Sequence, residues 1–427
     1  MPETFILVGD AGTRLKDLDD NTFNVCVTSP PYYGLRDYGT SGDWTGGSDP
    51  NCQHVRNQHA KQPQGIQGRI SHEDALREAQ RLGATPPPEL HNRYPTAGRP
   101  IGDGRFVCEL CGAEKIDHQI GLEVTPDEYI ERMVEICREV MRVLRPDGVF
   151  FLNIGDSYAS RPAGNITPSG LIQNQPKRLS GREIAYPYNY KSFGDIKPKN
   201  LLMMPSRVAI ALQAEGWYLR SEIIWAKTSA MPERVEDRPT VAHEKIFLLT
   251  KSPNYFFDGY AVEDYSVSTS GAGNGYERPQ RQHKSSGNSE HWSDIGGFRN
   301  MRSVWWLGPE VSPDFHFATF PTEVPRRAIL SGLGRAGVCA KCGTPWRSVK
   351  GKNWAPTCSC GSAKPVGGMV LDPFLGSGTT AMVANSLGHD CVGIELSPDN
   401  ALQARQRILG DGRLHNQVTL NDLEMRL

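Results

Sequence analysis

The feature that most constrains the fold is a buried strand followed by a glycine-rich turn and a helix, within residues 370–380. The apolar run ends at Asp372, and Gly376 and Gly378 precede a helical pattern that begins at Thr379. Glycine lets the backbone turn sharply and approach a ligand closely, and parallel α/β sheets bind nucleotides at turns of this kind. The next predicted strand ends at Glu395, whose carboxylate is placed to accept hydrogen bonds from both hydroxyls of a ribose.

Strand and helix patterns alternate along much of the chain. A helix is predicted from Pro126, because Thr125 and Glu128 form a capping box around a proline at the first helical position. Its apolar spacing continues to Leu144, and a turn is expected at residues 146–148. Predicted strands cover residues 5–8, 23–28, 149–154, 222–225, 245–250, 369–372 and 391–395. The alternation predicts an α/β fold with a Rossmann-like, doubly wound and mostly parallel sheet.

Bulk properties exclude several classes of protein. The 47 Lys and Arg residues balance 48 Asp and Glu residues, so any nucleic-acid surface must be a local basic patch. No segment approaches the roughly 18 consecutive apolar residues of a membrane helix, and the first residues do not resemble a secretory signal. We therefore expect a soluble, cytoplasmic protein.

Polar stretches rich in Gly, Pro, Ser and Asn interrupt the α/β pattern at residues 40–119, 157–199 and 262–303. The most basic is 157–199, which contains Lys177, Arg178 and Arg182. A solvated insertion and a phosphate-contacting loop are both open interpretations of this composition.

The glycine turn alone leaves its ligand open. Gly-x-Gly-x-x-Ala also fits a nicotinamide-binding turn, whereas a phosphate-binding P-loop is excluded because no lysine follows the glycines. A tight turn beside a surface glutamate is a further alternative.

A second motif, Thr28-Ser29-Pro30-Pro31-Tyr32, lies where the strand over residues 23–28 ends. The two prolines have no N–H donors and fix φ, so the carbonyl groups here are rigid acceptors. An amino group that donates to the Ser29 side chain and the Pro30 carbonyl would be oriented for in-line attack on an electrophile. Tyr32 offers a ring on which an extruded base can stack. A proline-braced strand end is the alternative for Pro-Pro-Tyr alone.

Together these motifs carry a resemblance to a known family. Thr28-Ser29-Pro30-Pro31-Tyr32 resembles the catalytic signature of amino-group DNA methyltransferases, and Asp372-Pro373-Phe374-x-Gly376-x-Gly378-Thr379-Thr380 resembles their S-adenosylmethionine motif. The catalytic motif precedes the cofactor motif, as in the circularly permuted β group. Residues 316–321 resemble the methionine-side cofactor element, and Asp10 resembles another cofactor-pocket position. Arg238-Pro239, His243-Glu244, Lys251-Ser252-Pro253 and Tyr255 resemble a late catalytic block.

The resemblance implies a catalytic domain assembled from residues 1–39, 120–156, 200–261 and 304–427. It implies methyl transfer from S-adenosylmethionine to a flipped base of double-stranded DNA, in the cytoplasm of a bacterial, archaeal or phage-infected cell. A cognate restriction endonuclease is a further partner to test for, and the oligomeric state stays open. The implied catalytic residues are Ser29, Pro30, Pro31 and Tyr32. The implied cofactor-binding residues are Asp10, Phe320, Asp372, Phe374, Gly376, Gly378, Thr379 and Glu395.

Ser29 at the first motif position, in place of Asp or Asn, resembles the cytosine-N4 subgroup, and adenine N6 is the alternative target. A 5-methylcytosine enzyme is excluded because the chain has no Pro-Cys pair for a nucleophile. In this family the stretch that corresponds to residues 262–303 usually recognises the target sequence, so Arg299 and Arg302 are DNA-binding candidates. An ordinary surface loop would have much the same composition.

The cysteines favour metal over disulfides, because their spacings are short. Cys339, Cys342, Cys358 and Cys360, within residues 336–364, have the spacing of paired zinc knuckles. Cys52, His54, Cys108 and Cys111 form a second, more loosely spaced candidate in the 40–119 insert, in which His59 could replace His54. We expect one or two structural zinc ions, with unbound reduced thiols as the alternative.

Two functions from other classes remain as alternatives. A nicotinamide-dependent oxidoreductase would explain the glycine turn and Glu395 but not Thr28 to Tyr32. A zinc-stabilised, non-enzymatic DNA-binding protein would explain the cysteines but not an intact catalytic signature.

Overall fold

The computed structural model describes residues 2–34, 43–46, 106–107, 113–116, 119–123, 125–159, 196–197, 199–230, 232–233, 235–265, 298–308, 310, 320–349, 353–411 and 417–421. Several sequence-based candidates lie outside these residues: Lys177, Arg178, Arg182, Cys52, His54, Cys108 and Cys111. Within the described residues, no helix has the length and apolar character needed to cross a membrane.

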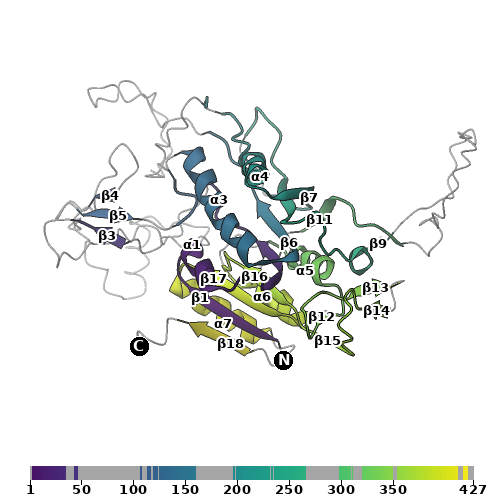
Figure 1. Cartoon of the computed structure of the whole chain (residues 1–427). Helices are drawn as coiled ribbons and strands as arrows, with labels where there is room; N and C mark the ends of the chain where they lie inside the picture. Colours follow the sequence, from purple (N-terminus) through teal and green to yellow (C-terminus); the bar gives the residue numbers. More distant parts are fainter. Residues whose placement is uncertain are drawn as a thin grey trace, which may run out of the picture.

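A nine-stranded sheet forms the centre of the protein (Figure 1). Its order is β11 (Val304–Leu307), β7 (Tyr218–Lys227), β8 (His243–Thr250), β6 (Leu144–Ile154), β2 (Phe23–Thr28), β16 (Met369–Asp372), β17 (Asp390–Glu395), β1 (Glu3–Val8) and β18 (Gln417–Asn421). In this sheet β8 runs antiparallel to β6 and β7, and the other neighbouring strands pair in parallel. The predicted mostly parallel sheet is confirmed.

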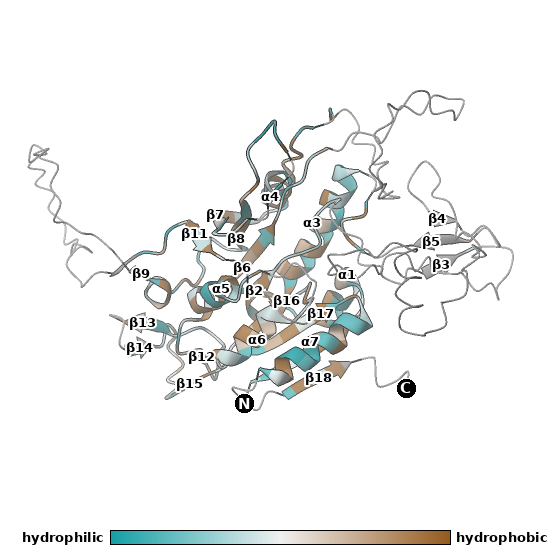
Figure 2. Ribbon diagram, turned by 180° about the vertical axis from the view of Figure 1, so that it is seen from behind, coloured by the Kyte–Doolittle hydropathy of each residue, from teal (hydrophilic) through white to brown (hydrophobic). Residues whose placement is uncertain are grey.

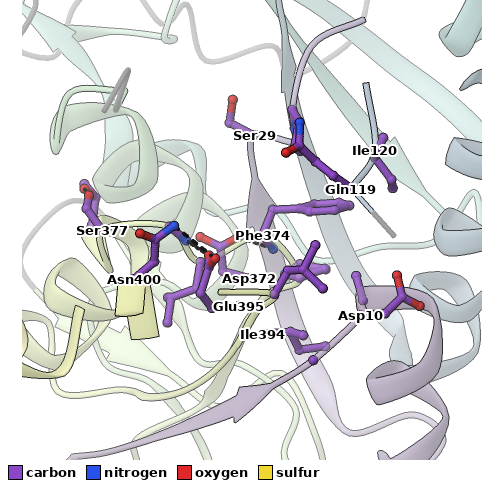
Figure 3. A pocket seen from close by; sticks show the side chains of 18 of the residues that line it. Asp10, Ser29, Gln119, Ile120, Asp372, Phe374, Ser377, Ile394, Glu395 and Asn400 are labelled. Carbon is purple, nitrogen blue, oxygen red and sulfur yellow. Dashed lines mark hydrogen bonds between the residues drawn. The ribbon is translucent and has the colours of Figure 1, made fainter. Parts of the chain in front are cut away.

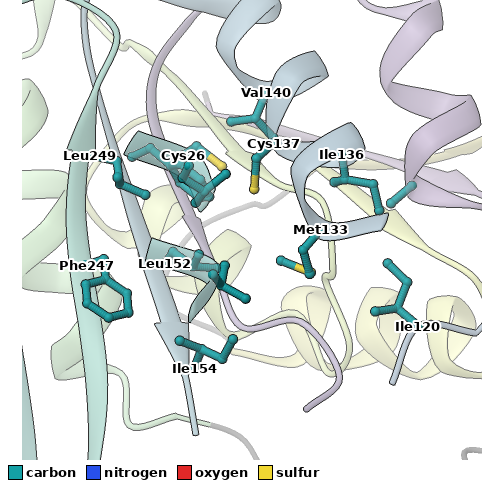
Figure 4. Packing of buried hydrophobic residues seen from close by; sticks show 14 of the residues in the cluster. Cys26, Ile120, Met133, Ile136, Cys137, Val140, Leu152, Ile154, Phe247 and Leu249 are labelled. Atoms are coloured by element: carbon teal, nitrogen blue, oxygen red, sulfur yellow. The ribbon is translucent and has the colours of Figure 1, made fainter. Parts of the chain in front are cut away.

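Helices cover both faces of this sheet (Figures 1 and 2). One face packs against α1 (Ala11–Arg14), the short 3-10 helix η1 (Leu15–Asp17), α3 (Pro126–Val143) and α4 (Met204–Ala214), and the other against α5 (Glu323–Leu333), α6 (Thr379–Ser386) and α7 (Pro398–Gly410). Side chains alternate between the two faces along each strand. Cys26 packs on the face covered by α3, as Figure 4 shows, whereas Val25 and Val27 pack on the face covered by α5 and α6. The fold is therefore doubly wound.

The start of α3 confirms the predicted capping box. Thr125 Oγ1 accepts a hydrogen bond from Glu128 N at 3.2 Å, and Glu128 reaches back to Thr125 N. The turn predicted at residues 146–148 is wrong, because β6 begins at Leu144 and runs through these residues. The register shifts between Phe23, opposite Leu144, and Val25, opposite Val149, so the extra residues form a bulge instead of a turn.

The connections of the sheet reverse direction between β2 and β16. The chain leaves β2 through α3 on one face, and it leaves β16 through α6 on the opposite face, moving toward the other edge. Ligands of doubly wound sheets bind at the carboxyl ends of the strands at such a switch point. The two sequence motifs are far apart in the chain, but they begin at the carboxyl ends of these neighbouring strands, at Thr28 and Asp372.

Small β-structures accompany the large sheet. A three-stranded sheet has the order β3 (Asp43–Thr45), β5 (Glu114–Ile116) and β4 (Phe106–Val107). A 3-10 helix η3 (Gly259–Val262) precedes β9 (Asp264–Tyr265), which pairs with β10 (Phe298–Arg299). Between α5 and β16, β12 (Val338–Cys339) pairs with β15 (Pro365–Val366), and β13 (Arg347–Val349) pairs with β14 (Asn353–Ala355). The limits predicted for the inserts remain predictions.

Candidate active site

A pocket with about 960 Å³ of space, part of it open to solvent, lies at the switch point (Figure 3). This size is in the range of small-molecule sites. Its lining brings together nine residues predicted from the sequence: Asp10, Ser29, Pro31, Phe320, Asp372, Phe374, Gly376, Thr379 and Glu395. Pro30, Tyr32 and Gly378 are not among the lining residues.

Asp372 joins the two motif strands at the floor of the pocket. Its Oδ1 accepts hydrogen bonds from Thr28 Oγ1 at 2.5 Å and from Phe374 N at 3.1 Å. Burial raises the pKa of Asp372 to about 6, against the lowering effect of its hydrogen bonds. The link fixes the start of the Ser-Pro-Pro-Tyr loop beside the glycine turn.

The glycine turn needs its glycines for conformation. Gly376 has φ of 52° and Gly378 has φ of 80°, in the left-handed region that other residues rarely adopt. A Cβ on Gly378 would also lie 3.1 Å from the side chain of Ile408 on α7. Arg407 on α7 secures the turn, because its Nη1 donates to Ser377 O, Ser377 Oγ and Thr379 Oγ1 at 2.8–3.1 Å.

Glu395 ends β17 with both carboxylate oxygens engaged. Oε2 accepts from Gly376 N at 2.9 Å, and Oε1 accepts from Ser397 N at 3.0 Å and Asn400 Nδ2 at 3.3 Å. Burial raises the pKa of this carboxyl group above its ordinary value, and the three donors oppose the rise. The donors hold the carboxylate in one orientation at the pocket wall, as a hydroxyl-binding site requires.

Asp10 lies at the opposite side of the pocket in Figure 3. Its carboxylate caps α1 by accepting hydrogen bonds from Thr13 N at 3.0 Å and from Thr13 Oγ1 at 3.1 Å. The preceding Gly9 donates its N–H to the Glu395 carbonyl at 2.9 Å, so the ends of β1 and β17 close against each other.

The Ser-Pro-Pro-Tyr loop places only part of its motif in the pocket. Ser29 and Pro31 line it, and the Pro31 carbonyl accepts a hydrogen bond from Tyr129 on α3 at 3.1 Å. Within the described part of the chain, the Pro30 carbonyl accepts no hydrogen bond. Pro30 is buried and does not line the pocket, so its role as a hydrogen-bond acceptor stays a prediction.

Tyr32, the last residue of the loop, is half-buried and does not line the pocket. Its hydroxyl contacts Ser29 Oγ at 3.1 Å, Glu244 Oε2 on β8 at 2.5 Å and Asn153 Nδ2 on β6 at 2.8 Å. A Cβ on Gly155 would lie 2.6 Å from the Tyr32 ring, so a larger residue there would displace the ring.

Several pocket and loop residues were not predicted from the sequence: Gln119, Ile120, Ser377, Asn400, Arg407 and Asn153. Asn153 had a detectable signal, because it is a polar residue in an otherwise apolar strand. Gln119 and Asn400 had none, because only the folded chain brings them to the pocket.

The four cysteines of the 336–364 insert come together. The sulfur atoms of Cys339, Cys342, Cys358 and Cys360 lie within 4.8 Å of one another. Tetrahedral zinc with Zn–S bonds of about 2.3 Å needs sulfur atoms roughly 3.8 Å apart, so the cluster fits a zinc ion after small adjustments. Hydrogen bonds with Thr344 lower the pKa of Cys342 to about 6, whereas Cys342 and Cys358 raise that of Cys360 to about 12. A cation would remove this competition between thiolates.

The cysteine cluster lies near the amino ends of the central strands β2 and β16, at the end of the sheet opposite to the pocket. Asn24, at the start of β2, donates to Gly343 O at 3.0 Å and accepts from Met369 N, at the start of β16, at 3.1 Å. The pocket lies at the carboxyl ends of the same strands. This separation supports a structural role for the cluster.

The two DNA-binding candidates in the described residues lie near β9 and β10. Arg299 belongs to β10, and the Arg302 side chain is 63% exposed with its Nε 3.7 Å from Asp264. A weak ion pair of this kind contributes little and leaves the guanidinium accessible.

Comparisons with known proteins agree on one family. A family model described as DNA methylase matches residues 23–406. The type II methyltransferase M.SmaI of Serratia marcescens is 31% identical over 404 residues, which are 95% of this chain and 90% of the relative. The type II methyltransferase M.Cfr9I of Citrobacter freundii is 38% identical over 296 residues, 69% of this chain and 76% of the relative.

Solved structures show weaker similarity. The PvuII DNA methyltransferase (cytosine-N4-specific) is 13% identical with a TM-score of 0.48, over 97% of this chain and 91% of that chain. TTHA0409 from Thermus thermophilus, in complex with S-adenosyl-L-methionine, is 16% identical with a TM-score of 0.42, over 97% of this chain and 99% of that chain.

Proposed function

Because the chain belongs to the DNA methylase family, we propose that it transfers a methyl group to the N4 amino group of cytosine in double-stranded DNA. Family membership confirms the coarser expectations, namely a DNA methyltransferase with S-adenosylmethionine as the methyl donor. The target base, the flipping step and the roles of individual residues are the proposal.

One observation carries the proposal: Ser29 and Pro31 line the same pocket as Asp372, Phe374 and Glu395. A methyl donor and an acceptor amino group must meet within a few ångströms for direct transfer. In the proposed arrangement Glu395 binds the ribose hydroxyls of the cofactor, and Asp10, Phe374 and Phe320 contribute to the rest of its pocket. S-adenosylmethionine supplies a methyl group on a positively charged sulfonium.

Residues of the loop orient the target amino group. Ser29 Oγ and the Pro30 carbonyl accept its two hydrogens, so the nitrogen lone pair is turned out of conjugation with the ring and toward the methyl group. Transfer would form an N–C bond and break the S–C bond, the S–C electron pair would stay on the sulfur as a neutral thioether, and the proton lost from the amino group would pass to water. Tyr32, fixed against Gly155, offers a ring for the flipped base to stack on.

Serine at the first motif position supports cytosine N4 over adenine N6. The names of the relatives place them in type II systems, which supports a double-stranded target and a cognate restriction endonuclease as partner.

Nucleoside mass spectrometry of DNA treated with the protein and S-adenosylmethionine tests the proposal. We expect N4-methylcytosine. N6-methyladenine would assign the chain to the other amino-group target, and 5-methylcytosine or an absence of methylation would refute the proposed role of the loop.

A further inference from the structure

A chain of hydrogen bonds runs from Ser29 through Tyr32, both in the Ser-Pro-Pro-Tyr loop, to Glu244 on β8. Tyr32 Oη lies 3.1 Å from Ser29 Oγ and 2.5 Å from Glu244 Oε2. Lys227 Nζ on β7 binds the other carboxylate oxygen of Glu244 at 2.6 Å. The Glu244 side chain is 13% exposed, so solvent competes little for these contacts. This carboxylate has no place in the roles assigned so far.

The chemistry of the groups fixes the direction of each hydrogen. A carboxylate only accepts hydrogen bonds, so the single hydroxyl proton of Tyr32 points to Glu244. Burial, followed by the Glu244 charge, raises the pKa of Tyr32, so this proton stays in place. The contact between the two hydroxyls must then use the Ser29 proton. Ser29 Oγ consequently keeps its lone pairs, and not its proton, for a further donor, and Ser29 is one of the residues that line the pocket.

Asn153 supports the same direction. Its Nδ2 lies 2.8 Å from Tyr32 Oη and 2.9 Å from Glu244 Oε2, with a longer contact of 3.3 Å to Ser29 Oγ. The carboxamide oxygen would be repelled by the carboxylate in that position, so Glu244 also sets the orientation of the amide. Asn153 Oδ1 is buried and has no partner among the described residues, as expected if the carboxylate turned it away.

We propose that Glu244 is a positioning residue that acts through Tyr32 to keep Ser29 Oγ a hydrogen-bond acceptor for the target amino group. The inference rests on the proposed function, because it assumes that Ser29 receives a hydrogen of that group. Without a carboxylate at position 244, the Tyr32 proton is free to turn toward Ser29. Ser29 would then direct its own proton at the amino group, and two donors would face each other.

Two variants test the chain. Glu244→Gln replaces the acceptor-only carboxylate with an amide that also donates, and Tyr32→Phe removes the bridging hydroxyl but keeps the ring for stacking. We expect each variant to slow single-turnover methyl transfer by at least about tenfold, with S-adenosylmethionine dissociation constants within about twofold of the wild type. Glu222→Gln is the matched control, because Glu222 on β7 also pairs with a cross-strand lysine, Lys245 at 3.1 Å. It should retain the wild-type rate.

The double variant Glu244→Gln/Tyr32→Phe separates positioning from a general structural effect. If both residues act through the same chain of hydrogen bonds, either substitution already removes the whole effect on the rate. The double variant should therefore transfer methyl groups no more slowly than the slower single variant. Losses that multiply, or a wild-type rate in Glu244→Gln, would overturn the inference while leaving the proposed function intact. No methylation of a base amino group by the wild type would overturn both.

Discussion

At the scale of single residues, we expect Glu395 to have the largest effect on cofactor affinity. Three donors hold its carboxylate at the pocket wall, so its removal deletes a charged hydrogen-bond acceptor and frees the glycine turn. We expect Glu395→Ala to weaken S-adenosylmethionine binding by about 1–3 kcal/mol, measured by calorimetry. Asp390→Asn is the control, because this partly exposed carboxylate at the start of the same strand contacts Glu3 N and not the pocket. Unchanged affinity in Glu395→Ala would remove Glu395 from the cofactor site.

Ser29 should affect turnover more than cofactor binding. Ser29→Ala removes the hydroxyl that is proposed to accept a hydrogen of the amino group, and it leaves the other pocket residues Asp372, Phe374 and Glu395 in place. We therefore expect a fall in kcat of at least about tenfold and a cofactor dissociation constant close to that of the wild type. Ser386→Ala is the control, because Ser386 is exposed on α6 and its hydroxyl donates a hydrogen bond to Val383 O. Equal losses in kcat and cofactor affinity would indicate a disturbed pocket instead.

The motif residues could be predicted from the sequence because each has a local signature. Proline-proline sets the backbone before Tyr32, and positive φ requires Gly376 and Gly378. Asn400 and Gln119 carry no such signature, since their positions at the pocket depend on how distant elements pack.

At the scale of elements, the cysteine insert between α5 and β16 should depend on metal. Its strands are only two or three residues long and cannot form a large core. We expect elemental analysis to find zinc in the purified protein, and Cys342→Ser to lose one ion and local order. Cys137→Ser, in the buried core of α3, should retain the zinc. Fully folded protein with no metal and four titratable thiols would contradict the assignment.

His389, which joins α6 to β17, should make part of the stability depend on pH. Burial lowers its pKa to about 4 from 6.5, and its Nδ1 accepts from Gly368 N at 3.1 Å. The unfolded chain takes up the proton near pH 6.5 and the folded chain only near pH 4. The stabilisation is therefore full above pH 6.5 and is lost as pH falls through about 4.

Denaturant unfolding of the wild type and His389→Gln between about pH 4 and pH 8 measures this contribution. The difference in unfolding free energy should shrink by up to about 3 kcal/mol as pH falls across that range. The same series with the exposed His243→Gln is the control. A pH-independent difference for His389→Gln would show that the histidine is not held neutral.

Elements differ in how well the sequence predicts them. Helix α3 was predictable because its capping box and apolar spacing are local. The edge strands β11 and β18 were not predicted, because pairing with β7 and β1 defines them. The expected turn at residues 146–148 failed for a related reason: β6 pairs with β2 on both sides of Pro-Asp-Gly, at Leu144 and from Val149 onward, so the intervening residues form a bulge within the strand.

At the scale of the whole molecule, the sheet explains how a permuted order of motifs forms one site. β1, at the start of the chain, lies between β17 and β18 from its end, and β2 lies beside β16. The hydrogen bond between Thr28 and Asp372 joins residues separated by 344 positions. Alternation predicted the sheet class, but only the strand order shows that the two motifs are neighbours.

DNA binding must overcome a formal charge of −1, so it should come from local cations. We expect affinity for duplex DNA to fall steeply with salt, because phosphate contacts release counterions. Lys177→Ala, Arg178→Ala and Arg182→Ala should weaken all sequences similarly, whereas Arg299→Ala or Arg302→Ala should change sequence preference if these residues contact base edges. Arg138→Ala is the control, because Arg138 on α3 is half-exposed and paired with Glu215 at 2.6 Å. Fluorescence anisotropy with target and scrambled duplexes at several salt concentrations separates the two classes. Wild-type affinity and preference in all five alanine variants would place the DNA interface on another surface.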